Sequence, residues 1–235
     1  MITTQKIRMP VDISMTILSV ILMGGTVLFP NDKVHQILGM VLLVLWTVHI
    51  VLNRKWYGAV LKGKYNPYRI MQTVVNFGIL LCAILLAVSG MMMAWFVPES
   101  VNVPLGFART AHLVGSHWYY IFMCAHLGMH INMIFSRIKA KRAERTEKAD
   151  TKSKTRAGKI IFRAVVALVC AYGVYAFIER GIAKYMFFRQ PFFFLDLERG
   201  YLLFAADYIS ILVLIATATH WLGKALRAWN SGRKE

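Results

Sequence analysis

The stretch KVHQILGMVLLVLWTVHIVLN, Lys33–Asn53, carries two histidines within an apolar run that is long enough to cross a bilayer. A membrane-crossing helix needs about 20 predominantly apolar residues. Ionisable side chains are costly inside such a helix, so their presence indicates a function. His35 and His49 are therefore the residues from which the interpretation of the chain starts.

Apolar segments of similar length recur along the chain, which has 235 residues and is 57% hydrophobic. Hydropathy and charge predict six membrane-spanning helices, at 11–30, 33–53, 71–97, 110–136, 159–179 and 201–223. Helices are expected because the strands of a membrane barrel would show alternating segments of about ten residues. The predicted fold is an all-α polytopic membrane protein.

A charged segment between the fourth and fifth predicted spans suggests how the chain is divided. Residues 138–158 are rich in Lys and Arg and poor in apolar residues, which is typical of a solvated linker. We therefore expect a four-helix bundle at 1–137, a basic cytoplasmic linker at 138–158 and a two-helix extension at 159–235.

The net charge of +17 is distributed unevenly about the predicted spans. If the N-terminus is cytoplasmic, all but six of the 28 Lys and Arg residues fall on the cytoplasmic side. The exceptions are Lys33, Arg109, Arg180, Lys184, Arg189 and Arg199. This asymmetry follows the positive-inside rule, so we expect both termini in the cytoplasm. Membrane lipid, and not nucleic acid, is the partner that this distribution predicts.

The spacing of the histidines predicts which of them face each other. At about 100° and 1.5 Å per residue, the fourteen-residue interval from His35 to His49 gives one helical face and a rise of about 21 Å. The same interval separates His112 from His126. The two spans run in the same direction and form the diagonal of an up-down bundle. His35 should therefore face His112, and His49 should face His126 or His130.

Two pairs of imidazoles near opposite membrane surfaces meet the needs of two bis-histidine haems. Haem iron takes one axial nitrogen from each side, so its ligands must come from opposing helices at one depth. The predicted cofactors are two b-type haems, which the four-helix bundle would hold through His35, His49, His112 and His126. The interval favours His126 as a ligand and His130 as a propionate contact, and the reverse assignment stays open. Small residues would leave room for the porphyrins: Gly24, Gly25, Gly39, Gly78, Gly90 and Gly128.

Other interpretations of the histidines were weighed against haem ligation. His117 and His220 fit a structural role, as polar groups that bond to a neighbouring helix. His126 and His130, at i and i+4, could hold a metal in a proton or metal transporter. The acidic residues, however, lie near predicted span ends or in loops, which does not favour a transport path. No catalytic side chain is predicted.

Several groups of residues, in their order and spacing, resemble a known family. They are His35 with Gly39, the run from His49 to Trp56, Ser89-Gly90, His112 and the block His126-LGM-His130. Together they resemble the flavinylation-associated cytochromes, bacterial membrane proteins similar to small two-haem cytochromes b. The resemblance covers residues 6 to about 136, and the loop PFFFLDLERG is similar to longer members.

This resemblance implies electron transfer across a bacterial cytoplasmic membrane. The donor would be quinol or another membrane or cytoplasmic reductant, and the acceptors would be extracytoplasmic flavoproteins with covalent FMN. Flavin would belong to the partner, because the sequence shows no GxGxxG fingerprint and no soluble domain large enough to hold it. A cytochrome b subunit of another quinol-linked respiratory oxidoreductase is the alternative, and whether the chain acts as an enzyme is left open.

Overall fold

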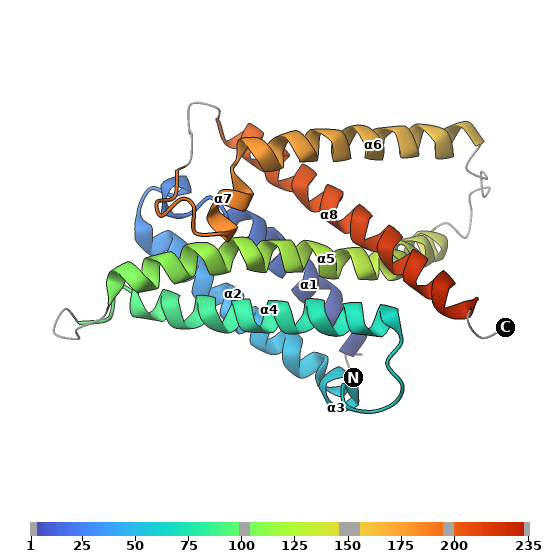
Figure 1. The fold of residues 1–235 in the computed structure, drawn as a ribbon, viewed down its shortest axis with the longest axis horizontal. Coiled ribbons are helices and arrows are strands. Elements are labelled where there is room, and N and C mark those ends of the chain that lie inside the picture. The colour runs from blue at the N-terminus through green and yellow to red at the C-terminus, as the bar shows by residue number, and fades with distance from the viewer. Residues whose placement is uncertain (1–3, 99–103, 146–155, 195–199, 233–235) are drawn as a thin grey trace.

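The computed structural model describes residues 4–98, 104–145, 156–194 and 200–232, and every regular element in these ranges is a helix (Figure 1). The long helices are α1 (Thr4–Leu22), α2 (Asp32–Leu52), α4 (Pro67–Met92), α5 (Leu105–Arg145), α6 (Arg156–Glu179) and α8 (Gly200–Ser231). The short elements are η1 (Thr26–Leu28), α3 (Arg54–Ala59) and α7 (Ile182–Met186). The prediction of an all-helical fold is confirmed.

Four helices in the described ranges are long and apolar enough to cross a membrane. They are Asp32–Leu52, Pro67–Met92, Ala157–Glu179 and Gly200–Ser231. The helices α1 and α5 do not meet this measure of length and composition. Charged residues occupy the start of α1, and α5 contains four histidines, which lower its hydropathy. The membrane character is thus supported, and the predicted number of six spans is not confirmed.

Local capping explains where α2 and α4 begin. The Asn31 side chain accepts a hydrogen bond from the backbone N–H of Val34 at 3.2 Å, which starts α2 close to the predicted boundary. The helix α4 begins before residue 71, because Asn66 accepts from the N–H of Arg69 at 2.8 Å and proline occupies the first turn. The cap residues therefore determine where α2 and α4 begin, and hydropathy alone placed both beginnings too late in the sequence.

Two other helix ends differ from the prediction. The first helix ends at Leu22 and not at residue 30, because Gly25 adopts a φ of 60°, which glycine reaches without a steric penalty. The helix α5 continues to Arg145, so the first part of the predicted linker at 138–158 is helical. Residues 146–155 of that linker lie outside the described residues.

The helix α8 joins the first four long helices to the C-terminal pair. In Figure 1, α4 and α5 run side by side, and α8 packs along both α5 and α6. A Cβ on Gly173 of α6 would lie 2.5 Å from the Ser210 carbonyl oxygen, and a Cβ on Gly128 of α5 would overlap the backbone of Ala216. The expectation that Gly128 makes room for a porphyrin is wrong, because its face is taken by α8.

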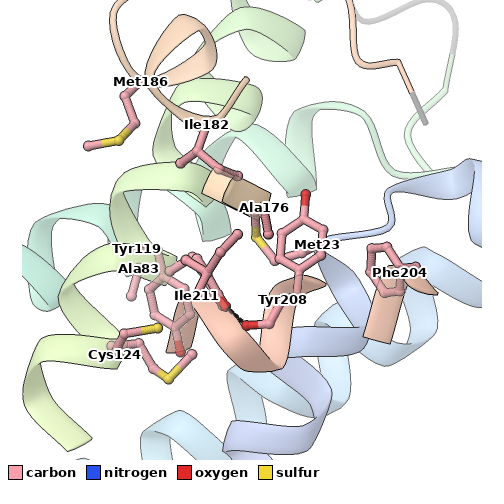
Figure 2. Packing of buried hydrophobic residues seen from close by; sticks show 12 residues of the cluster. Met23, Ala83, Tyr119, Cys124, Ala176, Ile182, Met186, Phe204, Tyr208 and Ile211 are labelled. Atoms are coloured by element: carbon pink, nitrogen blue, oxygen red, sulfur yellow. Dashed lines mark hydrogen bonds between the residues drawn. The ribbon is translucent and has the colours of Figure 1, made fainter. Parts of the chain in front are cut away.

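A buried apolar cluster lies where α5 meets α6, α7 and α8 (Figure 2). Its members are Met23, Ala83, Tyr119, Tyr120, Met123, Cys124, Ala176, Ile182, Met186, Phe204, Tyr208 and Ile211. The Tyr120 hydroxyl donates a hydrogen bond to the Tyr208 carbonyl, which satisfies a polar group within this cluster. The C-terminal helices therefore share a core with α5.

The ends of the long helices lie on two opposite sides of the molecule. The beginning of α1, the short helix α3 and the end of α8 lie toward one side, on the right in Figure 1. The short helix α7 lies toward the other side, together with the end of α4 and the beginning of α5. The axis of the long helices thus defines two opposite surfaces of the protein.

Candidate functional site

Two histidine pairs connect α2 with α5. The ring centroids of His35 and His112 are 6.3 Å apart, with 68° between the ring planes. The rings of His49 and His126 are also 6.3 Å apart, with an angle of 74°. Since α2 packs mainly on α1 and α5 mainly on α4 and α8, the imidazoles reach across the space between α2 and α5.

The structure brings together the residues that the fourteen-residue intervals paired. His35 lies in the first turns of α2 and His49 in its last turn. Because α2 and α5 are both regular helices over these intervals, the two pairs are separated by about 21 Å along the helix axes. We call His35 and His112 the outer pair, and His49 and His126 the inner pair.

The ring spacing in each pair fits a metal ion with two axial imidazoles. A metal–nitrogen bond to histidine is about 2.0 Å, and the nitrogen lies about 1.1 Å from the ring centre, so two such ligands on opposite sides of one metal hold their centroids about 6.2 Å apart. The measured separation is 6.3 Å in both pairs. The rings of His126 and His130, which lie on one helix, are closer together, with centroids 4.6 Å apart.

Hydrogen bonds at Nδ1 orient both rings of the inner pair. The Nδ1 of His49 lies 2.7 Å from Asp12 Oδ1, and the Nδ1 of His126 lies 2.8 Å from Asn76 Oδ1. Both oxygens are acceptors, so each Nδ1 carries the hydrogen and donates it. The lone pair of each neutral ring is then on Nε2, which is free to bind a metal.

The outer pair shows the same arrangement at His112. The Ser89 hydroxyl donates its hydrogen to the Leu85 carbonyl at 2.6 Å, so it accepts a hydrogen bond from Nδ1 of His112 at 3.1 Å. The Nδ1 of His35 is buried and has no hydrogen-bond partner in the described part of the chain, and the ring lies 5.9 Å from that of Phe29. Three of the four histidines are thus fixed with Nε2 available.

A pocket of about 590 Å³ lies beside the outer pair and is lined by both of its histidines. This volume is within the range of roughly 300–1,000 Å³ that is common for ligand sites. Gly39 lines the pocket, and a Cβ there would meet nothing within 4 Å. Gly25 and Gly90 also line it, whereas Gly78 accommodates the ring of Phe122.

The remaining histidines lie outside the two pairs. The ring of His130 contacts that of His126, on the same helix, whereas the ring opposite His49 is that of His126. His117 is 1% exposed and stacks on Tyr185 of α7 with centroids 4.5 Å apart. His220 lies 6.0 Å from Trp221 near the end of α8. These positions do not add a third ligand to either pair.

The sequence prediction missed two partners of the inner pair. Asp12 and Asn76 come from α1 and α4, which the spacing of the histidines does not address. A signal was nevertheless present, since Asn76 is a polar residue within an apolar helix and Asp12 lies near the predicted depth of His49. Ser89, the partner of His112, belongs to the residues that carry the family resemblance.

The number of imidazoles in each pair bears on which group could bind there. No group of three or more His, Cys, Asp or Glu side chains that could hold a metal occurs among the residues that the structure describes. A zinc site takes three or four protein ligands. Two imidazoles per site are the number that a porphyrin leaves for the protein to supply.

Comparisons of the chain with family models, with curated proteins and with solved structures find no match. The resemblance to the flavinylation-associated cytochromes therefore remains a prediction from the quoted residues.

Proposed function

We propose that this protein is a di-haem b-type cytochrome that transfers electrons across a membrane. The observation that carries the proposal is the separation of 6.3 Å in both histidine pairs, which suits one iron with two axial imidazoles. Bound haem supplies the one-electron chemistry, which no side chain of the protein needs to perform.

The protein's own residues have three tasks in this proposal. His35, His49, His112 and His126 provide the axial nitrogens. Asp12, Asn76 and Ser89 hold three of these rings in the required tautomer and orientation, as the outer partners of metal-bound histidines commonly do. The largely apolar residues of the outer pocket would surround the haem bound by its pair.

The proposal requires that α1 and α5 also cross the membrane. Supporting this, α5 packs along α4 and α8, and α1 packs along α2, all three of which are candidate spans. The start of α1 and the end of α8 lie on the same side of the molecule (Figure 1), as an even number of spans requires. We place both termini in the cytoplasm of a bacterial cell, at the cytoplasmic membrane, on the basis of the positive-inside asymmetry.

We propose a quinol as the electron donor and extracytoplasmic flavoproteins as the acceptors. A pocket of about 400 Å³ lies at the α3 end of the helices and is lined by Trp56, Lys62, Tyr68 and Gln72, among others. Gln72 is one turn before Asn76 on the same face of α4, which connects this pocket to the inner pair. An aromatic pocket with hydrogen-bonding side chains suits a flat ring that carries hydroxyl groups. Support for the flavoprotein comes from the sequence resemblance alone.

Two alternatives make different predictions for what copurifies. A cytochrome b subunit of another quinol-linked respiratory oxidoreductase would copurify with a molybdenum or iron-sulfur subunit in place of a flavoprotein. A histidine-based metal or proton transporter would lack haem. The geometry favours haem over the transporter, because each pair offers only two ligands to one ion.

An absorption spectrum tests the proposal directly. The purified protein is reduced with dithionite, its oxidised spectrum is subtracted, and haem is quantified as pyridine haemochrome against protein. We expect two b-type haems per chain. A flat difference spectrum from protein produced with ample haem would contradict the proposal.

A further inference from the structure

The outer pocket has a wall that comes from the C-terminal part of the chain. The side chains of Pro191, Phe192 and Phe193 line the same pocket as His35 and His112. These three residues follow α7, whereas the outer pair belongs to α2 and α5. The two-helix extension therefore contributes directly to a site whose histidines lie in the first four long helices.

Phe193 is fitted closely to the connection between α1 and α2. A Cβ on Gly25 would lie 2.9 Å from the ring of Phe193, so only a glycine allows the ring to pack at this distance. Phe193 is half-buried, and it also belongs to the residues packed against the buried apolar cluster. Phe193 therefore borders the pocket next to η1, whose Thr26 and Val27 also line it.

Hydrogen bonds to one tyrosine hold the segment that carries Phe193. The Tyr185 hydroxyl accepts from the backbone N–H of Phe194 at 3.1 Å and from the Gln190 side chain at 3.0 Å. The indole N–H of Trp118 donates to the Met186 carbonyl at 3.0 Å, which ties α7 to α5. The segment 187–194 is thus anchored on α5 at its beginning and on Tyr185 at its end.

His117 of α5 packs against Tyr185 and holds it in place. Its ring stacks on that of Tyr185, with centroids 4.5 Å apart and 22° between the planes. The Nδ1 of His117 donates to the Leu113 carbonyl at 2.8 Å, which fixes the ring on α5. The histidine that the helical spacing left outside both pairs therefore lines the outer pocket itself and also supports its α7 side through Tyr185.

We propose that residues 191–193, positioned by His117 and Tyr185, form a wall that excludes water from the outer haem and thereby sets its reduction potential. The inference rests on the proposed function. Oxidation adds a positive charge at the site, and an apolar, dry surrounding disfavours that charge. Opening the wall should therefore favour the oxidised form of the outer haem and lower its potential, without changing the inner one.

The test is an optical redox titration of the Phe193→Ala variant. We expect a shift of roughly tenfold toward the oxidised form, about 59 mV for a one-electron couple, in the outer step alone. The titration should show one reduction step for each haem. The step of the outer haem is the one that is lost when His35 and His112 are both replaced by Ala. His117→Ala should shift the reduction step of the outer haem in the same direction, because it removes the ring on which Tyr185 stacks.

Matched variants separate a wall from a general loss of structure. Phe194→Ala truncates the neighbouring phenylalanine, which is 75% exposed and does not line the pocket, and it should leave both steps unchanged. Phe193→Leu should largely restore the outer step, since it refills the space. An unmoved outer step, equal shifts of both haems, or the same effect from Phe194→Ala would overturn the inference while the haem content still supports the proposed function. Protein without haem would overturn both.

Discussion

His49 of α2 and His126 of α5 face each other at 6.3 Å, and each ring is held by an acceptor from a different helix. Asp12 of α1 bonds to one Nδ1 and Asn76 of α4 to the other. Four helices thus contribute to the inner pair, although only two of them carry its histidines. The site depends on the relative placement of α1, α2, α4 and α5.

The structure distinguishes the two candidate ligands on α5. His126→Ala should reduce the haem content from two to one per chain, because it removes the ring that faces His49. His130→Ala should retain two haems, because this ring contacts His126 and is not the one opposite α2. Pyridine haemochrome analysis of both variants measures the difference. Retention of two haems in His126→Ala together with loss in His130→Ala would show that the assignment is reversed.

The outer pair can be removed independently of the inner pair. The double substitution His35→Ala and His112→Ala should leave one haem per chain, because the inner pair lies about 21 Å away along the helices. A reduced-minus-oxidised spectrum of half the wild-type amplitude would support this. If both haems persisted, the two rings at 6.3 Å would not be the ligands of one iron.

Asp12 should matter for haem affinity through His49. Removing a partner of a metal-bound histidine commonly costs 10–100-fold, roughly, in affinity, so Asp12→Ala should weaken haem retention at the inner site by about this factor. Asp12→Asn keeps an acceptor oxygen and should lose less. Thr16→Ala is a suitable control, because the Thr16 hydroxyl donates to the Asp12 backbone carbonyl within α1, at 2.8 Å, and not to the Asp12 carboxylate. Competition for haem with an excess of apomyoglobin provides the measurement, and equal retention in all three variants would contradict the role of Asp12.

The histidine pairs could be predicted from the sequence because a helix has a fixed rise and rotation. Two equal intervals on two helices determine which rings share a face and a depth, whatever surrounds them. The limits of α2 were also predictable, since its apolar run ends at Asn53, which caps the helix. The end of α1 was not predictable, because the chain leaves the helix at a glycine with a positive φ, Gly25, while the sequence stays apolar.

Features that depend on a neighbouring helix could not be predicted from the sequence. Which glycines face a pocket and which face a backbone is decided by tertiary packing, so Gly39 and Gly128 looked alike although only Gly39 borders open space. The surroundings of Asp207 were likewise not predictable. The sequence indicated only that Asp207 is near the end of a span, and the structure shows it buried against Arg180. The helical extension of α5 into charged residues was missed because Ala, Lys, Arg and Glu favour helix without an apolar face.

The close approach of α5 and α8 predicts opposite effects for two glycines on one helix. Gly128→Ala should lower the unfolding temperature, because the added methyl overlaps the Ala216 backbone; overpacking of this kind costs about 1–3 kcal/mol. Gly106→Ala meets no atom within 4 Å and should leave that temperature unchanged or raise it, since alanine favours helix by about 0.5–1 kcal/mol. Thermal unfolding in detergent compares the two. A destabilised Gly106→Ala with an unaffected Gly128→Ala would contradict the packing described here.

The buried ion pair between α6 and α8 should stabilise the C-terminal helices. Arg180 lies 2.7 Å from the Asp207 carboxylate, with side-chain exposures of 8% and 3%, and the Tyr172 hydroxyl donates to the same carboxylate at 2.6 Å. Asp207→Ala leaves the guanidinium buried without its counter-charge, which should cost about 3–5 kcal/mol of stability. The double substitution Arg180→Met and Asp207→Ala removes both charges and should cost less than the single substitutions Arg180→Met and Asp207→Ala together. Thermal unfolding of the three variants completes the cycle, and strictly additive effects would show that the two side chains do not act as a pair.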